Sequence, residues 1–187
     1  MQLLTMLVFL VTKDGGISNS STAEKQNSIF FEFRYPWESA RTGIDVTPYC
    51  CPSGRLYELH ITGDIAFAAR QYFAATGDKD WLLNGFGGDL IYQTAQFWSS
   101  RAVYSDTKKQ YEILNVLPPD EDAQPYKNNS VFTNAIAALS IQAANSISQI
   151  TNKTVPAQWL EIASNLYFPF DNATQTYLEY EGFDLSK

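Results

Sequence analysis

The feature that most constrains the fold is a helical spacing of apolar side chains in four separate segments of the chain. Apolar residues recur every three or four positions in segments 65–73, 88–102, 130–147 and 156–166, which places them on one face of an α-helix. Helices joined by loops are typical of stacked helical hairpins, in a closed α/α barrel or in an open solenoid. Four helices are too few to close a large barrel.

Capping residues give expected limits for these helices. Asp64 is expected to cap the first helix and Gly77-Asp78 to end it. Asn129 or Ser130 starts the third helix, and Pro156 fits the first turn of the fourth. The sequence thus predicts a mostly helical chain.

The stretches between the helices are expected to be turns or extended chain. Residues 111–116 are expected to be extended, and residues 167–183 to form extended chain or a hairpin around Asp171-Asn172. The glycines of segment 85–88 follow no predicted strand, which favours a turn at a helix start over a phosphate-binding loop.

Length and charge narrow the class of protein. The 187 residues are 45% apolar and 18% charged, as expected for one globular domain. A net charge of −7 and an isoelectric point near 4.6 argue against a nucleic-acid partner, whose phosphates require basic patches. No apolar run reaches the roughly 20 residues of a membrane span. Most of the aromatic residues are expected in the core, and some can offer flat faces to sugars.

The N-terminal part, residues 1–32, is expected to form a separate tract before a domain at 33–187. Residues 3–11 have the length of a signal-peptide core, but no basic residue precedes them, and residues 15–28 resemble a linker. The adjacent Cys50 and Cys51 cannot form a disulfide framework. Glycosylation sequons favour a secretory route and occur at Asn19, Asn128, Asn152 and Asn172.

The best candidate for a catalytic acid is Glu121, which follows Pro118-Pro119-Asp120. Glycoside cleavage requires a carboxylic acid that protonates the leaving oxygen and a second carboxylate that directs the attacking group. Repulsion from Asp120 and Asp122 would favour the protonated form of Glu121. The alternative is an ordinary solvated acidic turn, which this composition also fits.

Two further clusters can contact a sugar. Trp37 can stack on a sugar ring while Arg34 and Glu38 bind its hydroxyls; alternatively, Trp37 is buried and Glu38-Ser39 caps a helix. His60, the only histidine, can bind a hydroxyl or accept a proton, but it is equally consistent with a structural, hydrogen-bonded side chain. The sequence contains no spacing typical of a metal or cofactor site.

Taken together, these stretches resemble glycoside hydrolase family 65. The family segment Arg-Tyr-Pro-Trp-Glu-Ser-Ala stands at residues 34–40, and Glu-x-His-x-x-Gly-Asp-Ile-Ala-Phe-Ala stands at 58–68. The Pro-Asp-Glu acid loop stands at 119–121, followed by an Asn-Asn-x-x-x-Thr-Asn helix start at 128–134. The resemblance runs from about Phe33 to about Phe183, and the ending is most similar to the animal branch of collagen-disaccharide glucosidases.

The resemblance implies part of an (α/α)6 barrel that cleaves α-glucosides with inversion. It implies Glu121 as general acid, Trp37 and Glu38 as sugar contacts, and Thr62 at the position of an acceptor contact. The implied partner is a carbohydrate, most specifically the glucosyl-galactosyl-hydroxylysine unit of collagen. No cofactor is implied. The alternatives are a trehalase or a disaccharide phosphorylase of the same family, or an inactive fragment that binds carbohydrate.

Departures from the family pattern suggest a partial catalytic domain. Asp122-Ala123 stands where the family usually has Tyr-His. The upstream Trp-Asp segment and the downstream Lys-Gln pair and catalytic base are not matched. We therefore expect the isolated chain to lack measurable glucosidase activity, to expose apolar surface, and to be poorly soluble or self-associating.

Overall fold

The computed structural model describes residues 34–39, 45–48 and 52–186. The proposed signal core, the linker, Asn19 and the cysteine pair lie outside these residues. Within the described ranges, no helix is both long enough and apolar enough to cross a bilayer.

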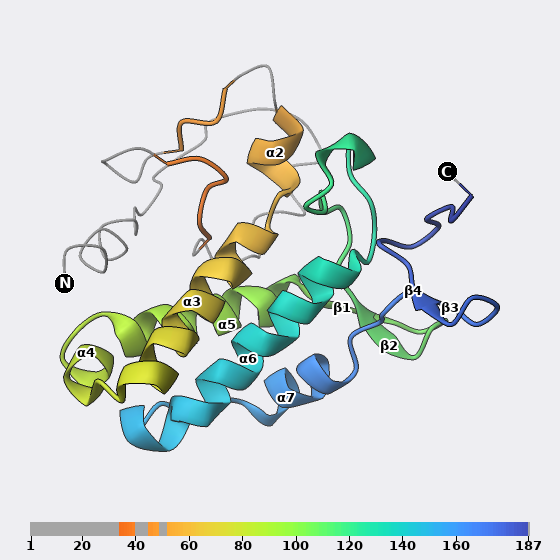
Figure 1. Cartoon of the computed structure of the whole chain (residues 1–187). Helices are drawn as coiled ribbons and strands as arrows, with labels where there is room; N and C mark the ends of the chain where they lie inside the picture. The colour runs from red at the N-terminus through yellow and green to blue at the C-terminus, as the bar shows by residue number, and fades with distance from the viewer. Residues whose placement is uncertain (1–33, 40–44, 49–51, 187) are drawn as a thin grey trace, which may run out of the picture.

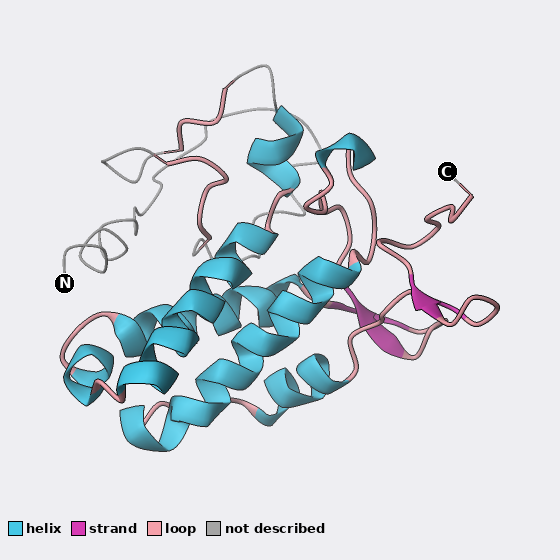
Figure 2. Ribbon diagram, viewed as in Figure 1, coloured by secondary structure: helices cyan, strands magenta, loops and turns pink. Residues whose placement is uncertain are grey.

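The described part of the chain is mostly helical, with two short hairpins (Figure 2). The helices are α2 (Pro52–Tyr57), α3 (His60–Thr76), α4 (Lys79–Leu83), α5 (Gly87–Arg101), α6 (Val131–Thr151) and α7 (Ala157–Ser164). The strands are β1 (Val103–Ser105), β2 (Gln110–Glu112), β3 (Phe170–Asp171) and β4 (Thr176–Tyr177), and a 3-10 turn, η2, covers Glu121–Ala123.

Helix α6 is the centre of the packing and lies against α3, α5 and α7 (Figure 1). Its buried face includes Ile141, which shares one apolar core with Ile91 and Trp98 of α5, all three fully buried. Helices α3 and α6 approach closely at Gly63, where an added Cβ would lie 2.5 Å from Ile136 Cγ2. The small residue therefore determines how near these two helices can pack.

The four long helices predicted from periodicity are confirmed. Gly77 ends α3 in the left-handed conformation with φ 63°, and Ser130 caps α6 by accepting a hydrogen bond from the Thr133 N–H. Pro156 lies directly before the first residue of α7, within the usual uncertainty of a helix end. The turn at 85–88 does lead into a helix, α5.

One cap prediction is wrong. Helix α3 begins at His60, so Asp64 lies inside its second turn, and its carboxylate contacts His60 Nδ1 at 3.1 Å instead of capping the helix. The short helices α2 and α4 were not predicted, because five or six residues are too few to show a periodic pattern.

Both extended regions form antiparallel hairpins. Strand β2 pairs with β1, placing Tyr104 opposite Tyr111, and the expected hairpin around Asp171 is confirmed by the β3–β4 pair. A single bridge joins Tyr111 to Leu166, two residues beyond the end of α7. The hairpins lie beyond one end of the helical layer, on the side where α6 begins (Figure 1).

Candidate functional site

The loop that carries Glu121 is closed at its base by backbone hydrogen bonds. Val116 and Lys127 exchange two of them, with N–O distances of 2.9 and 2.8 Å. The Leu117 N–H also donates to the Tyr57 carbonyl at 2.8 Å, which fixes the loop against the last residue of α2. In Figure 1 the η2 turn accordingly lies beside α2, at the end of the molecule where α3 begins.

Glu121 is the first residue of η2 and is exposed. Asp120 precedes the turn, and its side chain accepts a hydrogen bond from the Asp122 N–H at 3.1 Å. Asp120 thus has a local capping role. The Pro-Pro-Asp stretch therefore leads into a defined 3-10 turn that presents Glu121 on the surface.

Glu58, between α2 and α3, is a buried carboxyl that our sequence reasoning did not single out. The residue is 4% exposed, and its Oε1 has no hydrogen-bond partner among the described residues. The pKa of Glu58 is raised to about 7, mainly by burial and secondly by the negative charge of Glu121, while His60 acts in the opposite direction. Glu58 therefore holds its proton far more strongly than an exposed glutamate does, and it lies within the electrostatic reach of Glu121.

His60 is buried between two carboxyl groups. Its Nδ1 is 3.1 Å from Asp64 Oδ2, and its Nε2 is 3.9 Å from Glu58 Oε2, too far for a hydrogen bond. The ring lies perpendicular to that of the exposed Phe132, with ring centroids 5.6 Å apart. The imidazole orientation is thus fixed by Asp64, and Nε2 has no hydrogen-bond partner in the described structure.

Thr62 has a structural contact in this chain. The residue is fully buried, and its hydroxyl accepts a hydrogen bond from the Tyr35 N–H at 3.0 Å. This bond joins the Arg-Tyr-Pro-Trp segment to the first turn of α3.

Trp37 lies against α2, on the same side as Glu58. A Cβ added to Gly54 would be 3.2 Å from the indole and 3.1 Å from Glu58 Oε1, so both groups share the space above this glycine. Arg34 donates to the Arg55 and Leu56 carbonyls, each at 3.3 Å.

Glu38, also predicted to bind sugar, is exposed. Its backbone N–H donates to Thr47 Oγ1 at 3.4 Å, and Ser39 forms a bridge with Asp45. The structure therefore brings Trp37, His60 and Glu121 around Glu58, and it gives Arg34 and Thr62 partners within the protein.

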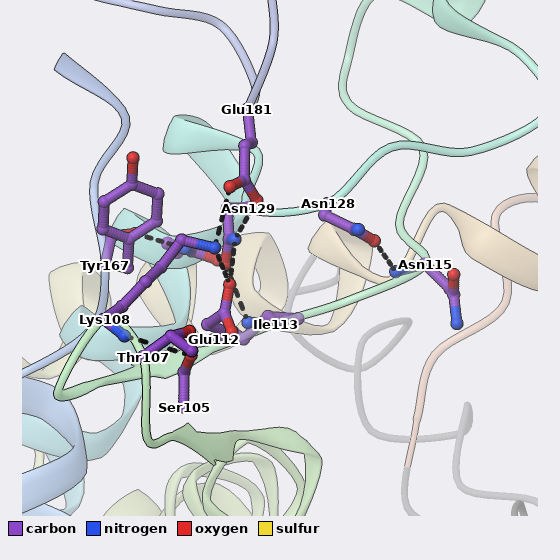
Figure 3. Close-up of polar contacts among 11 residues, drawn as sticks. Ser105, Thr107, Lys108, Glu112, Ile113, Asn115, Asn128, Asn129, Tyr167 and Glu181 are labelled. Atoms are coloured by element: carbon purple, nitrogen blue, oxygen red, sulfur yellow. Dashed lines mark hydrogen bonds and ion pairs between the residues drawn. The ribbon is translucent and has the colours of Figure 1, made fainter.

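A buried polar network holds the end of the acid loop and the start of α6 (Figure 3). Asn129 is fully buried with φ 54°, and its Nδ2 donates to Glu112 Oε1 and Glu181 Oε2, both at 2.8 Å. Its Oδ1 accepts from the Ile113 N–H at 3.2 Å. Lys108 Nζ bridges the same two carboxylates at 2.5 and 2.7 Å. Asn129 thus joins β2, the start of α6 and the C-terminal segment.

Hydrogen bonds stabilise the ionised form of Glu112 inside this network. Burial on its own would raise the pKa of Glu112, but hydrogen bonds from Lys108 and Asn129 outweigh it, and the pKa is lowered. The C-terminal segment is held by the backbone as well, because the Val131 N–H donates to the Glu179 carbonyl and the Glu181 N–H to the Asn128 carbonyl. The motif asparagines of this segment therefore have a structural role.

No group of three or more His, Cys, Asp or Glu side chains is arranged to hold a metal ion within 34–39, 45–48 and 52–186.

Comparison with known proteins places this arrangement among carbohydrate-active catalytic domains. The model of the glycosyl hydrolase family 65 central catalytic domain matches residues 22–187. The protein-glucosylgalactosylhydroxylysine glucosidase of Dictyostelium discoideum is 38% identical over 182 residues, which is 96% of this chain and 25% of that protein. A kojibiose phosphorylase of Caldanaerobacter subterraneus is 35% identical over 176 residues, covering 80% of this chain and 23% of that protein.

The fold has a solved counterpart. A chain assigned as a kojibiose phosphorylase, from the human microbiome, superimposes with a TM-score of 0.64 at 17% identity, over 76% of this chain and 22% of that one. The chain therefore belongs to glycoside hydrolase family 65. It spans about a quarter of the length of the curated relatives that it matches.

Proposed function

We propose that this chain forms the acid-bearing part of a catalytic domain that hydrolyses α-glucosides with inversion, with Glu121 as the general acid. In the step assigned to it, the Glu121 carboxyl gives its proton to the glycosidic oxygen as the bond from that oxygen to the anomeric carbon breaks. Water attacks the opposite face of the sugar and loses a proton to a second carboxylate. The helical layer would then be part of an (α/α)6 barrel.

The observation that carries this proposal is the shared neighbourhood of Glu121, Glu58 and Trp37. The charge of Glu121 acts on Glu58, and the indole of Trp37 packs above Gly54 beside the same carboxyl. An aromatic face can position a sugar by stacking, and a nearby carboxyl can supply the proton. His60 adds a ring nitrogen, Nε2, with no hydrogen-bond partner among the described residues. This nitrogen could form a hydrogen bond with a sugar hydroxyl.

The substrate we favour is the glucosyl-galactosyl-hydroxylysine unit, from which terminal glucose would be removed. This choice follows the Dictyostelium relative, whose name specifies that substrate and which matches 96% of the chain. Phosphorolysis of a glucose disaccharide is the second candidate, because a kojibiose phosphorylase matches 80% of the chain. Dependence of glucose transfer on inorganic phosphate distinguishes the two.

The test is an exchange with the Dictyostelium relative, which supplies the rest of the catalytic domain. Its matching segment is replaced by this chain, and glucose release from glucosyl-galactosyl-hydroxylysine is measured with and without phosphate. We expect glucose release that does not depend on phosphate. Glu121→Gln should reduce its rate by at least about 100-fold, the lower end of the rate loss typical for removal of a general acid.

The matched control is Asp122→Asn, which removes a neighbouring exposed carboxylate from the same turn. Asp122 contributes only one of the two charges expected to favour the protonated form of Glu121, so this variant should shift the pH profile of the chimera and leave its highest activity within a few-fold. A folded, active chimera in which Glu121→Gln has no greater effect than Asp122→Asn would overturn the assignment of Glu121.

A further inference from the structure

A pocket separate from the neighbourhood of Glu58 lies between α5, β2 and α7. It has a volume of about 270 Å³, and its walls include Gln96 of α5, Tyr111 of β2 and Trp159 of α7. None of its lining residues belongs to the group around Glu58, and α7 lies at the lower edge of Figure 1 while α2 lies at the upper edge. Pockets for drug-sized ligands have volumes of about 300–1,000 Å³. A pocket just below this range suits a ligand the size of one sugar ring.

The lining of this pocket is uncharged. Of the eight described residues that form it, none is acidic or basic. Gln96 and Gln158 each bring an amide, which can both donate and accept hydrogen bonds. The hydroxyls of Ser99 and Ser100 donate to carbonyls of their own helix at 2.8 Å, so their oxygens keep lone pairs that can accept a further hydrogen bond. Such a lining complements neutral hydroxyl groups and offers no opposite charge to a phosphate or a cation.

Two aromatic residues line the pocket, and each contacts a further ring. The ring of Trp159 lies 5.3 Å from that of Tyr92, and the ring of Tyr111 lies 5.2 Å from that of Tyr104, measured between centroids. Trp159 packs partly against the apolar core, which holds the indole in place beside the pocket. The C–H faces of a pyranose ring are apolar and stack on aromatic side chains, while its hydroxyls require hydrogen-bonding groups around them. The pocket offers both kinds of group.

We propose that the pocket between α5, β2 and α7 is a second carbohydrate site, which binds one neutral pyranose ring and does not cleave it. Cleavage of a glycoside requires a pair of carboxyl groups, and the described lining residues include none. Glu161 accepts a hydrogen bond from the Tyr111 hydroxyl at 3.4 Å, but it does not line the pocket. The inference goes beyond the function proposed above and does not depend on the role of Glu121.

The test is ¹⁹F NMR of the 187-residue chain labelled with fluorotryptophan and titrated with methyl α-glucopyranoside or methyl β-galactopyranoside. The four tryptophans are assigned by single Phe substitutions, and Trp159 reports on the pocket whereas Trp37 reports on the neighbourhood of Glu58. We expect the Trp159 signal to shift saturably with a dissociation constant on the order of 1 mM, the weak binding expected of so small a ligand. The second site is overturned by a Trp159 signal that does not shift, by a shift confined to Trp37, or by an equal shift with glycerol, which has hydroxyls but no ring.

A matched pair of variants tests the lining residues. Gln158→Ala removes an amide at an exposed position of α7 and should weaken binding by about 3- to 10-fold, the effect of one neutral hydrogen bond. Gln149→Ala removes the amide of an exposed glutamine of α6 that does not line the pocket, and it should leave the dissociation constant unchanged. Equal dissociation constants for the two variants would contradict the proposed site. Because no step of this experiment measures glucose release, its outcome is independent of whether Glu121 is the general acid.

Discussion

Asn129→Asp is the substitution whose effect the structure predicts most sharply. The side chain is fully buried, and its Nδ2 donates to Glu112 and Glu181. The carboxylate introduced by the substitution would turn that double donor into an acceptor between two negative charges, while its other oxygen still accepts from Ile113. Asp tolerates the backbone conformation at φ 54° as well as Asn does. Backbone strain should therefore contribute little to the change in the free energy of unfolding.

The magnitude follows from the two lost hydrogen bonds. Hydrogen bonds to charged groups each stabilise a protein by about 1.5–3 kcal/mol. Leaving a buried partner without a hydrogen bond costs more than the average net value of the bond. Lys108 still neutralises part of the charge at 2.5 and 2.7 Å. We therefore expect Asn129→Asp to lower the free energy of unfolding by about 3–5 kcal/mol at pH 7.5.

The measurement is urea unfolding followed by tryptophan fluorescence. The matched control is Asn128→Asp, an exposed neighbour whose Oδ1 only accepts from the Asn115 N–H, a role that a carboxylate retains. Its effect should stay within about 0.5 kcal/mol, as for ordinary surface substitutions. Equal losses for the two variants would refute the reasoning that the Asn129 amide donors stabilise the fold.

Two further variants test the buried carboxyl and the helix contact. Because the pKa of Glu58 is raised from 4.5 to about 7, the folded state binds more protons than the unfolded state between these values, and stability falls as pH rises through this window. At about 1.4 kcal/mol for each tenfold change in proton affinity, the full loss of stability is about 3.5 kcal/mol. Glu58→Gln should abolish this loss in urea unfolding from pH 4.5 to 8, whereas parallel curves for variant and parent would contradict it. Gly63→Ala brings a methyl group within 2.5 Å of Ile136 and should cost about 1–3 kcal/mol by overpacking. Thermal melts should show that Ile136→Ala relieves part of this cost, and strictly additive effects would argue against the contact.

The long helices could be predicted from the sequence because their apolar stripes run through several turns. The start of α3 could not be predicted in this way, because the general preference of Asp for the N-cap position makes Asp64 look like the start of the helix. In the folded chain that carboxylate has a partner on the same helix face, His60, one turn earlier. Interactions four residues apart inside a helix compete with capping, and composition does not distinguish them.

The candidate site could be predicted only in part. The family motifs drew attention to Glu121 and Trp37, and the structure places both near Glu58. Glu58 itself stood in a quoted motif, but nothing local indicates that its carboxyl is buried and lacks a hydrogen bond. The contacts of Asn129 join residues 17 and 52 positions away in the chain, and such pairs cannot be read from local spacing.

The closed base of the acid loop has a consequence for how this region tolerates change. Val116 and Lys127 are joined by two backbone hydrogen bonds. The ends of the loop between them therefore stay in place when the sequence or length of the loop changes. Lengthening such a loop costs only about 0.6 kcal/mol for each doubling of its length. Selection, natural or directed, can therefore reshape the surface around Glu121 through this one segment without disturbing the helices beneath it.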